Sequence, residues 1–457
     1  MNDLSRRQAI ERRDLAAVVF AGSATVMLLC LLLGTKGLPI HPVTSAGFFD
    51  LKIYRESARV VLSGLPLYAA KFQMGYGFTY PPAAALLFLP LTVCPLSVDE
   101  VVVSLLNVAL VVVIVRCTLR LRPLVPEDAA SLAREQMVAW LTSALALWLE
   151  PIMSALGYGQ IDLLIAALVL VDLTWGSEWR GSGIGIGVAA ALKLTPLIFI
   201  PYLALSGRGR MAGRSLATFA ASIVAVFVLV PGDAAAYWGR ALFELKRVTG
   251  HGRFAGRGPA NQSLRGALLR LAAGTPHLTV IWICACVAVA ALGLSLAVRA
   301  GRRGEEAWGF MLAAITGLLI CPVSWTHHWC IAVPGVILLL SAPQTTLRGR
   351  LLKPAIVLAS LGAVSIWALI VNDPNGRRLG IAGLLLGDIY VLAGLGTIAV
   401  AGLLELRRAG SRGAAGRLAA AAPHHGAALG LSPGHPGDSL RAIPGSQAAL
   451  LDRESVR

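Results

Sequence analysis

The feature that most constrains this chain is a succession of long apolar runs, which occupy most of its 457 residues. They cover roughly 15–33, 81–97, 101–120, 137–150, 161–175, 184–206, 215–231, 278–298, 308–321, 328–342, 352–371 and 381–404. Many approach the roughly 20 residues that a helix needs to cross a bilayer. Only 14% of the residues are charged, against about 25% in soluble domains. The short alternating segments of a membrane β-barrel are absent from the sequence, so we predict an all-α polytopic membrane protein.

The basic residues indicate how these runs are oriented. The formal net charge is +16, and arginines cluster in short connections at 206–214, 298–306, 346–353 and 405–412. Cytoplasmic loops of membrane proteins collect Lys and Arg, so we place these connections and both termini inside, with an even number of crossings, about twelve. We attribute the positive charge to this topology and to contact with membrane lipids, and we expect no nucleic-acid partner.

This topology divides the chain into three parts. They are a cytoplasmic basic N-terminus at 1–14, a transmembrane catalytic domain at 15–404 and a disordered cytoplasmic tail at 405–457. Arginines precede the first apolar run, as they do in a signal peptide, but the run is longer than a signal core and no small-residue cleavage pattern follows it. We therefore expect a retained first span. The tail is rich in Ala, Gly, Arg and His and has little hydrophobic periodicity.

One basic connection, bracketed by Arg116 and Arg134, admits two placements. Simple alternation of spans places it outside. It lies inside if 81–97 only dips into the membrane and 184–206 forms two short half-helices around Pro196. We prefer the second placement, because it also moves the polar residues of the middle of the chain to the outer side.

The first outer segment, 34–80, contains the stretch FFDLKIYRES, in which Asp50, Lys52 and Tyr54 follow a long apolar run. We expect a short amphipathic helix along the membrane interface. Its lipid-facing side chains would be Ile53, Ala58, Val60, Val61 and Leu62. At the N-terminal end of this helix, where the dipole favours an anion, Asp50 is either a helix cap or a carboxylate available for chemistry. Ionisable groups near membrane depth are costly and tend to be functional.

Further polar residues interrupt the apolar runs. Tyr80 precedes two prolines in FTYPPAAALLFLPL. The prolines indicate a helix start, and the tyrosine either belongs to that start or lines a sugar or headgroup site. Glu150 and Gln160 flank a Gly-rich break, with Asp162 close by. Backbone uncovered at such a break is buried in protein or lines a wet cavity, and we expect a cavity. The second outer segment, about 232–277, is either an exposed loop or a binding lid.

A lysine and two histidines complete the candidate set. Lys193 stands alone in ALKLTPLIFIPYL, where it either snorkels to the surface or pairs with an anionic phosphate. His327 and His328 lie between tryptophans in CPVSWTHHWCIAVP. Adjacent helical side chains point about 100° apart, so the two histidines could not easily ligate one ion. We expect them either to hydrogen-bond a phosphate or sugar or to face the interface. The seven cysteines lack zinc-site spacing, and we assign them no chemistry.

Several strings occur in a fixed order over about 50–335. They are DLKIYRESARVVLSGLPLY, GFTYPPAAALLFLPL, GYGQIDLLIAALVL, AAALKLTPLIFIPYL and CPVSWTHHWCIAVP. In this order the chain resembles glycosyltransferase family 87, a GT-C class family of actinobacterial type. The resemblance implies a GT-C fold of many membrane helices, interfacial helices in the first extracytoplasmic loop, and an active site on the outer side. It also implies a catalytic aspartate early in that loop, where Asp50 stands. Many GT-C enzymes carry a pair of acids there and some use a metal, but here Leu51 and Lys52 follow in place of a second acid, so we expect no metal and no other cofactor.

The implied function is transfer of a sugar from a polyprenyl-phosphate donor to a glycolipid or polysaccharide acceptor at the outer face of the cell membrane. Mannose in an α-1,2 linkage is the expected case, with phosphatidylinositol mannoside or lipomannan as acceptor. Asp50 would act as base in an inverting displacement, and Lys193 and the histidines would stabilise the departing phosphate. The alternatives are an arabinofuranosyltransferase and a transporter or flippase of lipid-linked sugar, although the sequence has no internal repeat of the transporter kind.

Overall fold

The computed structural model describes residues 3–33, 46–124, 132–176, 179–244, 247, 256–272, 274–341 and 380–421. Within these residues the regular structure is helical, and the only β pairing is an isolated antiparallel bridge between Asn261 and Trp325. This confirms the predicted all-α architecture. The chain divides after Leu404 into two units, 1–404 and 405–457, and the candidate site lies in the first.

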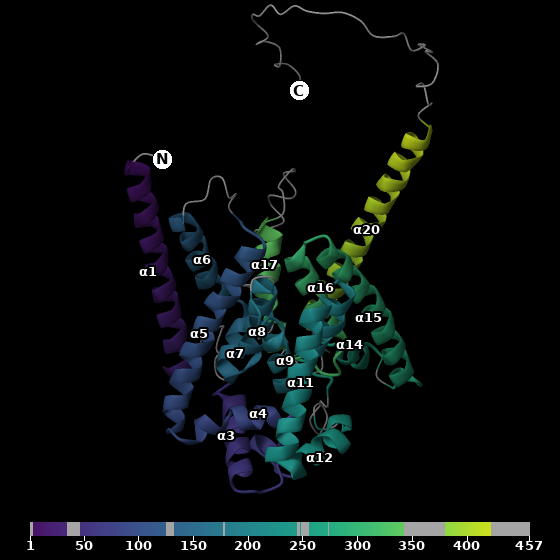
Figure 1. Cartoon of the computed structure of the whole chain (residues 1–457). Coiled ribbons are helices and arrows are strands. Elements are labelled where there is room, and N and C mark those ends of the chain that lie inside the picture. The colour runs from purple at the N-terminus through teal and green to yellow at the C-terminus, as the bar shows by residue number, and fades with distance from the viewer. Residues whose placement is uncertain are drawn as a thin grey trace, which may run out of the picture. The chain divides into compact units, whose positions relative to one another are not determined.

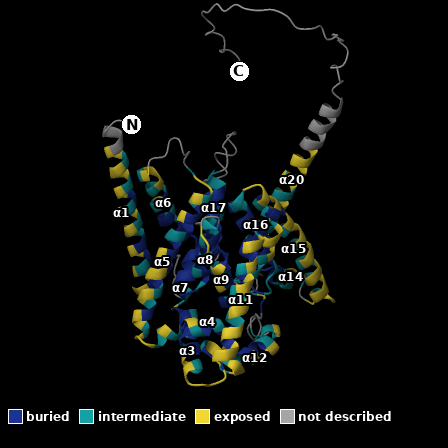
Figure 2. Cartoon of the chain, in the orientation of Figure 1, coloured by how far each residue is buried: buried dark blue, intermediate teal, exposed yellow. Residues whose placement is uncertain are grey.

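In the part of the chain that the structure describes, five helices are long and apolar enough to cross a membrane (Figure 1). They are α1 (Asp3–Leu33), α5 (Leu96–Leu121), α11 (Gly209–Leu229), α15 (Leu278–Arg302) and α20 (Ile389–Ala421). A sixth span results if α6 (Leu132–Ala146) and α7 (Glu150–Tyr158), which meet at a bend of 69°, cross together. The long helices expose many apolar side chains (Figure 2), among them Val18, Val228 and Val287. Such surfaces require lipid, so this is an integral membrane protein.

Other apolar segments are too short to cross in the same way. They include α16 (Glu306–Ile320), Thr195–Leu205 and Thr326–Ser341. The predicted run 352–371 lies outside the described residues. Helix α20 continues as far as Ala421, into the segment that the sequence predicts as a tail without regular structure.

The two runs that we expected to enter the membrane without crossing it are broken into short helices. Residues 81–97 form α4 (Pro82–Leu87), η2 (Leu89–Thr92) and the start of α5. Residues 184–206 form α9 (Ile184–Leu192), η4 (Thr195–Ile198) and α10 (Phe199–Leu205). The break lies at Lys193, whose backbone is extended, and Pro196 begins η4, where a missing N–H is tolerated. Figure 1 shows α1 and α5 running in opposite directions, so that α5 ends on the side of the molecule where α1 begins. This agrees with placing the connection after α5 on the side of the N-terminus.

A second, smaller core lies among α3 (Phe49–Leu62), α4 and α12 (Pro231–Gly239) (Figure 1). In this core the ring of Tyr54 stacks on that of Phe88, with centroids 4.2 Å apart. Ile53 and Ala58 are buried in it, at 8% and 0% exposure, so the prediction that they face lipid is wrong. The reason is that α4 and η2 pack on this face of α3. Of the predicted lipid-facing residues, Leu62 is the exposed one, at 62%.

The start of α3 differs from a capped helix. The cap position belongs to Phe48, which has left-handed backbone angles and no side-chain cap hydrogen bond, and Asp50 is already helical. Helix α7 ends at Gly159 with φ 68°. A Cβ at Gly159 would lie 2.7 Å from the Cβ of Leu51, so only glycine lets the two elements approach this closely. The contact brings Asp50 beside Gln160, and the capping interpretation of Asp50 is therefore wrong.

Candidate active site

A cavity of about 750 Å³ gathers polar side chains from distant parts of the chain. Seven of the predicted site residues line it: Asp50, Tyr54, Tyr80, Gln160, Lys193, His327 and His328. They come from α3, the loop before α4, the break between α7 and α8 (Asp162–Trp175), the α9–η4 break and η6 (Thr326–Trp329). The predicted residues Lys52 and Glu150 are not among the lining residues. The cavity expected at the Gly-rich break therefore exists, and most of the candidate set meets there.

Asp50 is held in this cavity by a neutral amide. Its Oδ2 accepts a hydrogen bond from Nε2 of Gln160 at 2.6 Å. The amide oxygen of Gln160 accepts hydrogen bonds from the hydroxyls of Tyr54, at 2.6 Å, and Tyr80, at 3.2 Å. Because a tyrosine hydroxyl donates to the amide oxygen, the amide can orient only with its NH₂ group toward the carboxylate. The sequence predicted these four residues as a set but not the order in which they connect.

Burial is the main influence on the pKa of the Asp50 carboxyl group. It raises the pKa of Asp50 from the ordinary value of 3.8 to about 7, although the hydrogen bond from Gln160 lowers the pKa. Among weaker effects, the nearby Asp162 raises the pKa of Asp50 and Lys193 lowers it. Burial also raises the pKa of Tyr80 to about 12, so this hydroxyl stays protonated at neutral pH. A carboxylate with a pKa near the working pH suits general base catalysis.

Lys193 faces the same cavity but is already paired. Its Nζ donates to Oδ1 of Asp162 at 2.6 Å, and Asp162 is the first residue of α8 (Asp162–Trp175). Both side chains are largely buried, so Lys193 does not snorkel to the surface. Its Nζ also lies 5.4 Å from the ring centroid of Tyr80. The other oxygen of Asp162, Oδ2, is buried and makes no hydrogen bond within the described part of the chain.

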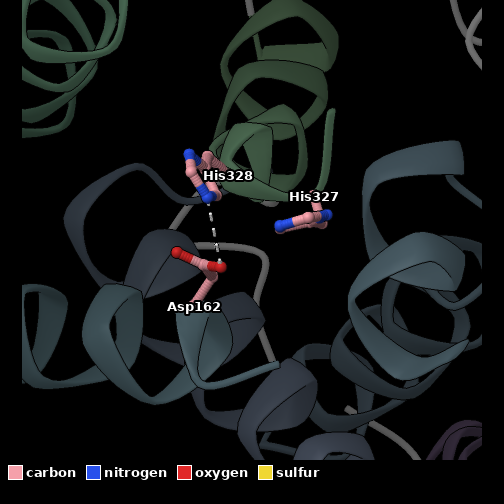
Figure 3. A group of neighbouring side chains, drawn as sticks. All are labelled: Asp162, His327 and His328. Atoms are coloured by element: carbon pink, nitrogen blue, oxygen red, sulfur yellow. Dashed lines mark ion pairs between the residues drawn. The ribbon is translucent and has the colours of Figure 1, made fainter. Parts of the chain in front are cut away.

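The two histidines turn toward this carboxylate (Figure 3). Nε2 of His328 lies 4.0 Å from Oδ2 of Asp162. Nδ1 of His328 accepts the backbone N–H of Trp325 at 3.2 Å, so the neutral ring carries its hydrogen on Nε2. His328 therefore presents a donor toward Asp162. Nε2 of His327 is buried and has no hydrogen-bond partner among the described residues, which leaves it available to a bound molecule.

The ligand atoms of Asp162, His327 and His328 lie within 4.8 Å of one another. The imidazole centroids are 4.7 Å apart, and the rings lie at 78° to one another. This set of ligand atoms nevertheless suits a metal cation poorly. A metal at His328 needs the lone pair of Nε2, which carries hydrogen here, and the ammonium of Lys193 already bonds one oxygen of Asp162. An N–H donor and an ammonium together suit an anionic or hydroxylated ligand.

Glu150 and Lys52 lie outside the cavity lining. Glu150 is fully buried, and its Oε2 accepts the hydroxyl of Tyr390 at 2.7 Å. It belongs to α7, which packs against η6, so it supports the element that carries His327. Lys52 is half-buried on α3.

Two charged residues of the site were missing from the predicted set. One is Asp162, which bonds Lys193 and lines a smaller neighbouring cavity that Lys193 and His328 share. Its signal was present in the sequence, because a lone lysine in one apolar run requires a carboxylate from another. The other is Arg247, which lines the cavity with Tyr237 and Leu242. These contacts favour a binding role for the described part of 232–277 over an exposed loop. Nothing in the sequence distinguishes Arg247 from the other arginines of that segment.

Membrane helices that surround a buried carboxylate, a paired lysine and clustered tyrosines define this protein as an integral membrane enzyme. Residues 78–324 match glycosyltransferase family 87. The chain belongs to this family, and it is a glycosyltransferase. This confirms the resemblance seen in the sequence motifs.

Curated relatives are similar over most of their length. The chain is 33% identical over 377 residues to the polyprenol-phosphate-mannose-dependent alpha-(1-2)-phosphatidylinositol mannoside mannosyltransferase of Mycobacterium tuberculosis, covering 79% of this chain and 85% of that protein. The protein of the same name from Mycolicibacterium smegmatis is 31% identical over 384 residues, covering 79% and 84%. A polyprenol-phosphate-mannose-dependent alpha-(1-2)-phosphatidylinositol pentamannoside mannosyltransferase of Mycobacterium tuberculosis is 32% identical over 389 residues, covering 82% and 86%. No solved structure matches the chain significantly.

Proposed function

We propose that this protein transfers mannose from a polyprenyl-phosphate-mannose donor to a phosphatidylinositol mannoside, forming an α-1,2 linkage. The names of the relatives support the donor, the acceptor and the linkage. The observation that carries the proposal is the state of Asp50, a cavity carboxylate that is held by an amide and has a pKa raised to about 7. Such a group is ionised in part near neutral pH and can accept a proton from a substrate hydroxyl.

In the proposed reaction, Asp50 removes the proton from an acceptor hydroxyl as that oxygen attacks the anomeric carbon of the donor. The new carbon–oxygen bond forms while the bond to the phosphate oxygen breaks, and the polyprenyl phosphate leaves with the electron pair. A single displacement inverts the anomeric configuration, so a β-linked donor gives an α-linked product. Positioned proton transfer of this kind contributes about 10²–10⁴-fold in rate.

The other wall of the cavity would stabilise the leaving phosphate. His328 presents its Nε2 hydrogen there, and Nε2 of His327 has no partner within the described ranges, while the ammonium of Lys193 bonds Asp162 beside His328. Preorganised donors directed at developing charge are an effective way to lower such a barrier. Tyr54 and Tyr80 act on Gln160 and contribute aromatic surface for a sugar. Lys52 and Glu150 support these elements from outside the cavity.

The proposed location is the cell membrane, with the cavity open to the outer side. The full chain would cross the membrane about twelve times, through the long helices and the shorter paired ones, and the α3–α4–α12 layer would lie at the outer interface. This orientation places the basic connections inside, as the positive-inside rule requires.

The test is a transfer assay with purified protein in lipid vesicles. Labelled polyprenyl-phosphate mannose and a phosphatidylinositol mannoside should give a labelled glycolipid with one more α-1,2-linked mannose, identified by linkage analysis. The same assay with a polyprenyl-phosphate arabinofuranose donor should give little product. Label that crosses the bilayer unmodified would instead identify a transporter, and arabinofuranosyl product at the higher rate would overturn the choice of sugar.

A further inference from the structure

Arg247 is a charged residue of the cavity lining to which the proposed reaction gives no role. Its side chain is only 9% exposed, and it lines the same cavity as Asp50 and Gly77. One end of its guanidinium, Nη1, is buried without a hydrogen-bond partner among the described residues. Guanidinium is permanently charged and has five N–H donors. Burying one end of it without a hydrogen-bond partner is unfavourable, unless a ligand in the cavity accepts those hydrogens.

The remaining donors of Arg247 fix its orientation. Nε and Nη2 donate to Oε2 of Glu244, at 3.2 Å and 2.8 Å. The centre of the guanidinium lies 5.7 Å from the ring centroid of Tyr68, and the hydroxyl of Tyr68 donates to the backbone oxygen of Tyr80. A carboxylate on one edge and an aromatic ring beside the group hold the planar fork in place. The free Nη1 end is therefore positioned before any ligand arrives.

Gly77 leaves the space that this end requires. A Cβ at Gly77 would lie 2.8 Å from Nη1 of Arg247, closer than the two atoms can approach without displacement of the guanidinium. Gly77 and Arg247 both line the cavity, so the absence of a side chain at 77 keeps the Nη1 hydrogens accessible. A purely structural arginine, satisfied by Glu244 alone, would not need this opening.

The cavity thus holds two cationic positions, one beside each of two neighbouring tyrosines. Lys193 lies 5.4 Å from the ring of Tyr80 and is neutralised by Asp162. Arg247 lies over Tyr68 on the other side of that tyrosine pair. The proposed reaction brings two lipids to one cavity, and each carries a phosphodiester. The donor phosphate belongs with the group formed by Lys193 and His328, which leaves Arg247 for the second phosphate.

We propose that Arg247 binds the phosphodiester of the lipid acceptor through its Nη1 hydrogens. This inference rests on the proposed function, because it takes a phosphatidylinositol mannoside as the acceptor. An arginine–phosphate contact is charge-assisted and directional, so it fixes the distance between the acceptor headgroup and Asp50. Arg247 is then a specificity-determining residue, which selects acceptors that carry a phosphate at the right distance from the reacting hydroxyl.

The experiment compares Arg247→Gln with the wild-type protein in vesicles, with the donor and acceptor varied separately. We expect the acceptor KM to rise about tenfold to a hundredfold, the loss typical of one hydrogen bond to a charged group, and the donor KM to change less than about twofold. Gly77→Ala should raise the acceptor KM in the same direction, because a Cβ at position 77 displaces the Nη1 end of the guanidinium. Arg240→Gln is the matched control, since Arg240 also bonds Glu244 but is 71% exposed and lies outside the cavity lining.

A phosphate-free acceptor separates recognition from folding. With an alkyl mannoside in place of the phosphatidylinositol mannoside, wild-type protein and Arg247→Gln should have equal kcat/KM. Equal losses with both acceptors would overturn the inference, and a rise in donor KM would overturn it by giving Arg247 to the donor phosphate. Binding of the phosphatidylinositol mannoside without donor, followed by protein fluorescence, gives an independent readout. Wild-type binding that Arg247→Gln weakens, without any transfer, would support the phosphate site while refuting the proposed function.

Discussion

Asp50 and Asp162 stand in the first turns of two helices, α3 and α8. Asp162 is buried and Asp50 is half-buried, and the cavities that they line share Lys193 and His328. They differ in what holds them. Asp50 accepts its hydrogen bond from the neutral amide of Gln160, whereas Asp162 accepts from the ammonium of Lys193. Ionisation of Asp50 is unfavourable because its hydrogen-bond partner is neutral, whereas the ammonium of Lys193 stabilises Asp162 as an ion.

This difference in hydrogen-bond partner distinguishes a catalytic base from a carboxylate that pairs with a lysine, and the sequence alone does not make that distinction. A carboxylate committed to an ammonium is a poor base, because a proton that it accepts would leave the ammonium buried and unpaired. A carboxylate held by an amide can gain a proton and keep its hydrogen bond through the second oxygen. The position of a carboxylate on its helix therefore does not identify the base. The charge of its hydrogen-bond partner does.

The largest expected effect is on turnover. Asp50→Asn removes the base and keeps the shape, so kcat should fall about 10²–10⁴-fold, while acceptor and donor binding change little. The measurement is steady-state transfer of mannose in vesicles, with binding of each lipid followed separately. Normal transfer by Asp50→Asn would exclude Asp50 as the base.

The same substitution should change the stability of the protein differently at the two aspartates. Asp162→Asn leaves the buried ammonium of Lys193 without its partner, which costs about 3–5 kcal/mol. Asp50→Asn removes a buried charge that no ammonium hydrogen-bonds, so at pH 8 it should leave stability unchanged or raise it. Unfolding in detergent by denaturant measures both values.

The control for this prediction is the double variant Asp162→Asn with Lys193→Met, which removes both charges. It should recover most of the stability lost in Asp162→Asn, because no unpaired charge remains. Equal losses from Asp50→Asn and Asp162→Asn would mean that the two carboxylates are held alike, and the comparison would fail.

The pH dependence of the wild-type protein tests the state of Asp50. The base acts when ionised, so kcat/KM should rise with pH through a midpoint near the pKa of about 7. Below that midpoint the rate should fall about tenfold per pH unit. A profile that is flat between neutral and weakly acidic pH would show a carboxylate with an ordinary pKa and would contradict the effect of burial.

The smallest effect is expected from Gln160, which positions Asp50. Its hydrogen bond lowers the pKa of Asp50, so Gln160→Ala should move the midpoint of the pH profile further to alkaline pH. Tyr54→Phe, which removes one donor to the amide oxygen, should move the midpoint less and in the same direction. A shift toward acidic pH in either variant would refute the proposed order of the network, and an unchanged midpoint would reduce Gln160 to a packing residue.

The sequence was sufficient for the class of fold and for most members of the site. Apolar runs predicted the long helices, and Pro196 indicated which segment is broken, although the break itself lies at Lys193. The motif order identified the family and pointed to Asp50. These features are local, since each depends on residues close together in the chain or on the length of one run.

The features that escaped prediction depend on contacts between distant elements. An amphipathic helix has the same pattern whether lipid or protein covers its apolar face, so Ile53 and Ala58 were assigned to lipid although α4 covers them. The partner of Lys193 is 31 residues away along the chain, and that of Asp50 is 110 residues away. The periodicity of apolar residues in the sequence does not indicate which distant residues pair.

The amide between Asp50 and the tyrosines has a consequence for how the enzyme resets after each turnover. Gln160 links the carboxylate to the hydroxyls of Tyr54 and Tyr80, but an amide neither gains nor loses a proton at physiological pH. The hydrogen-bond network therefore orients Asp50 but does not carry its proton away. The proton that Asp50 acquires in each cycle is instead returned to water through the cavity, so the base is reset from the same side on which the substrates bind.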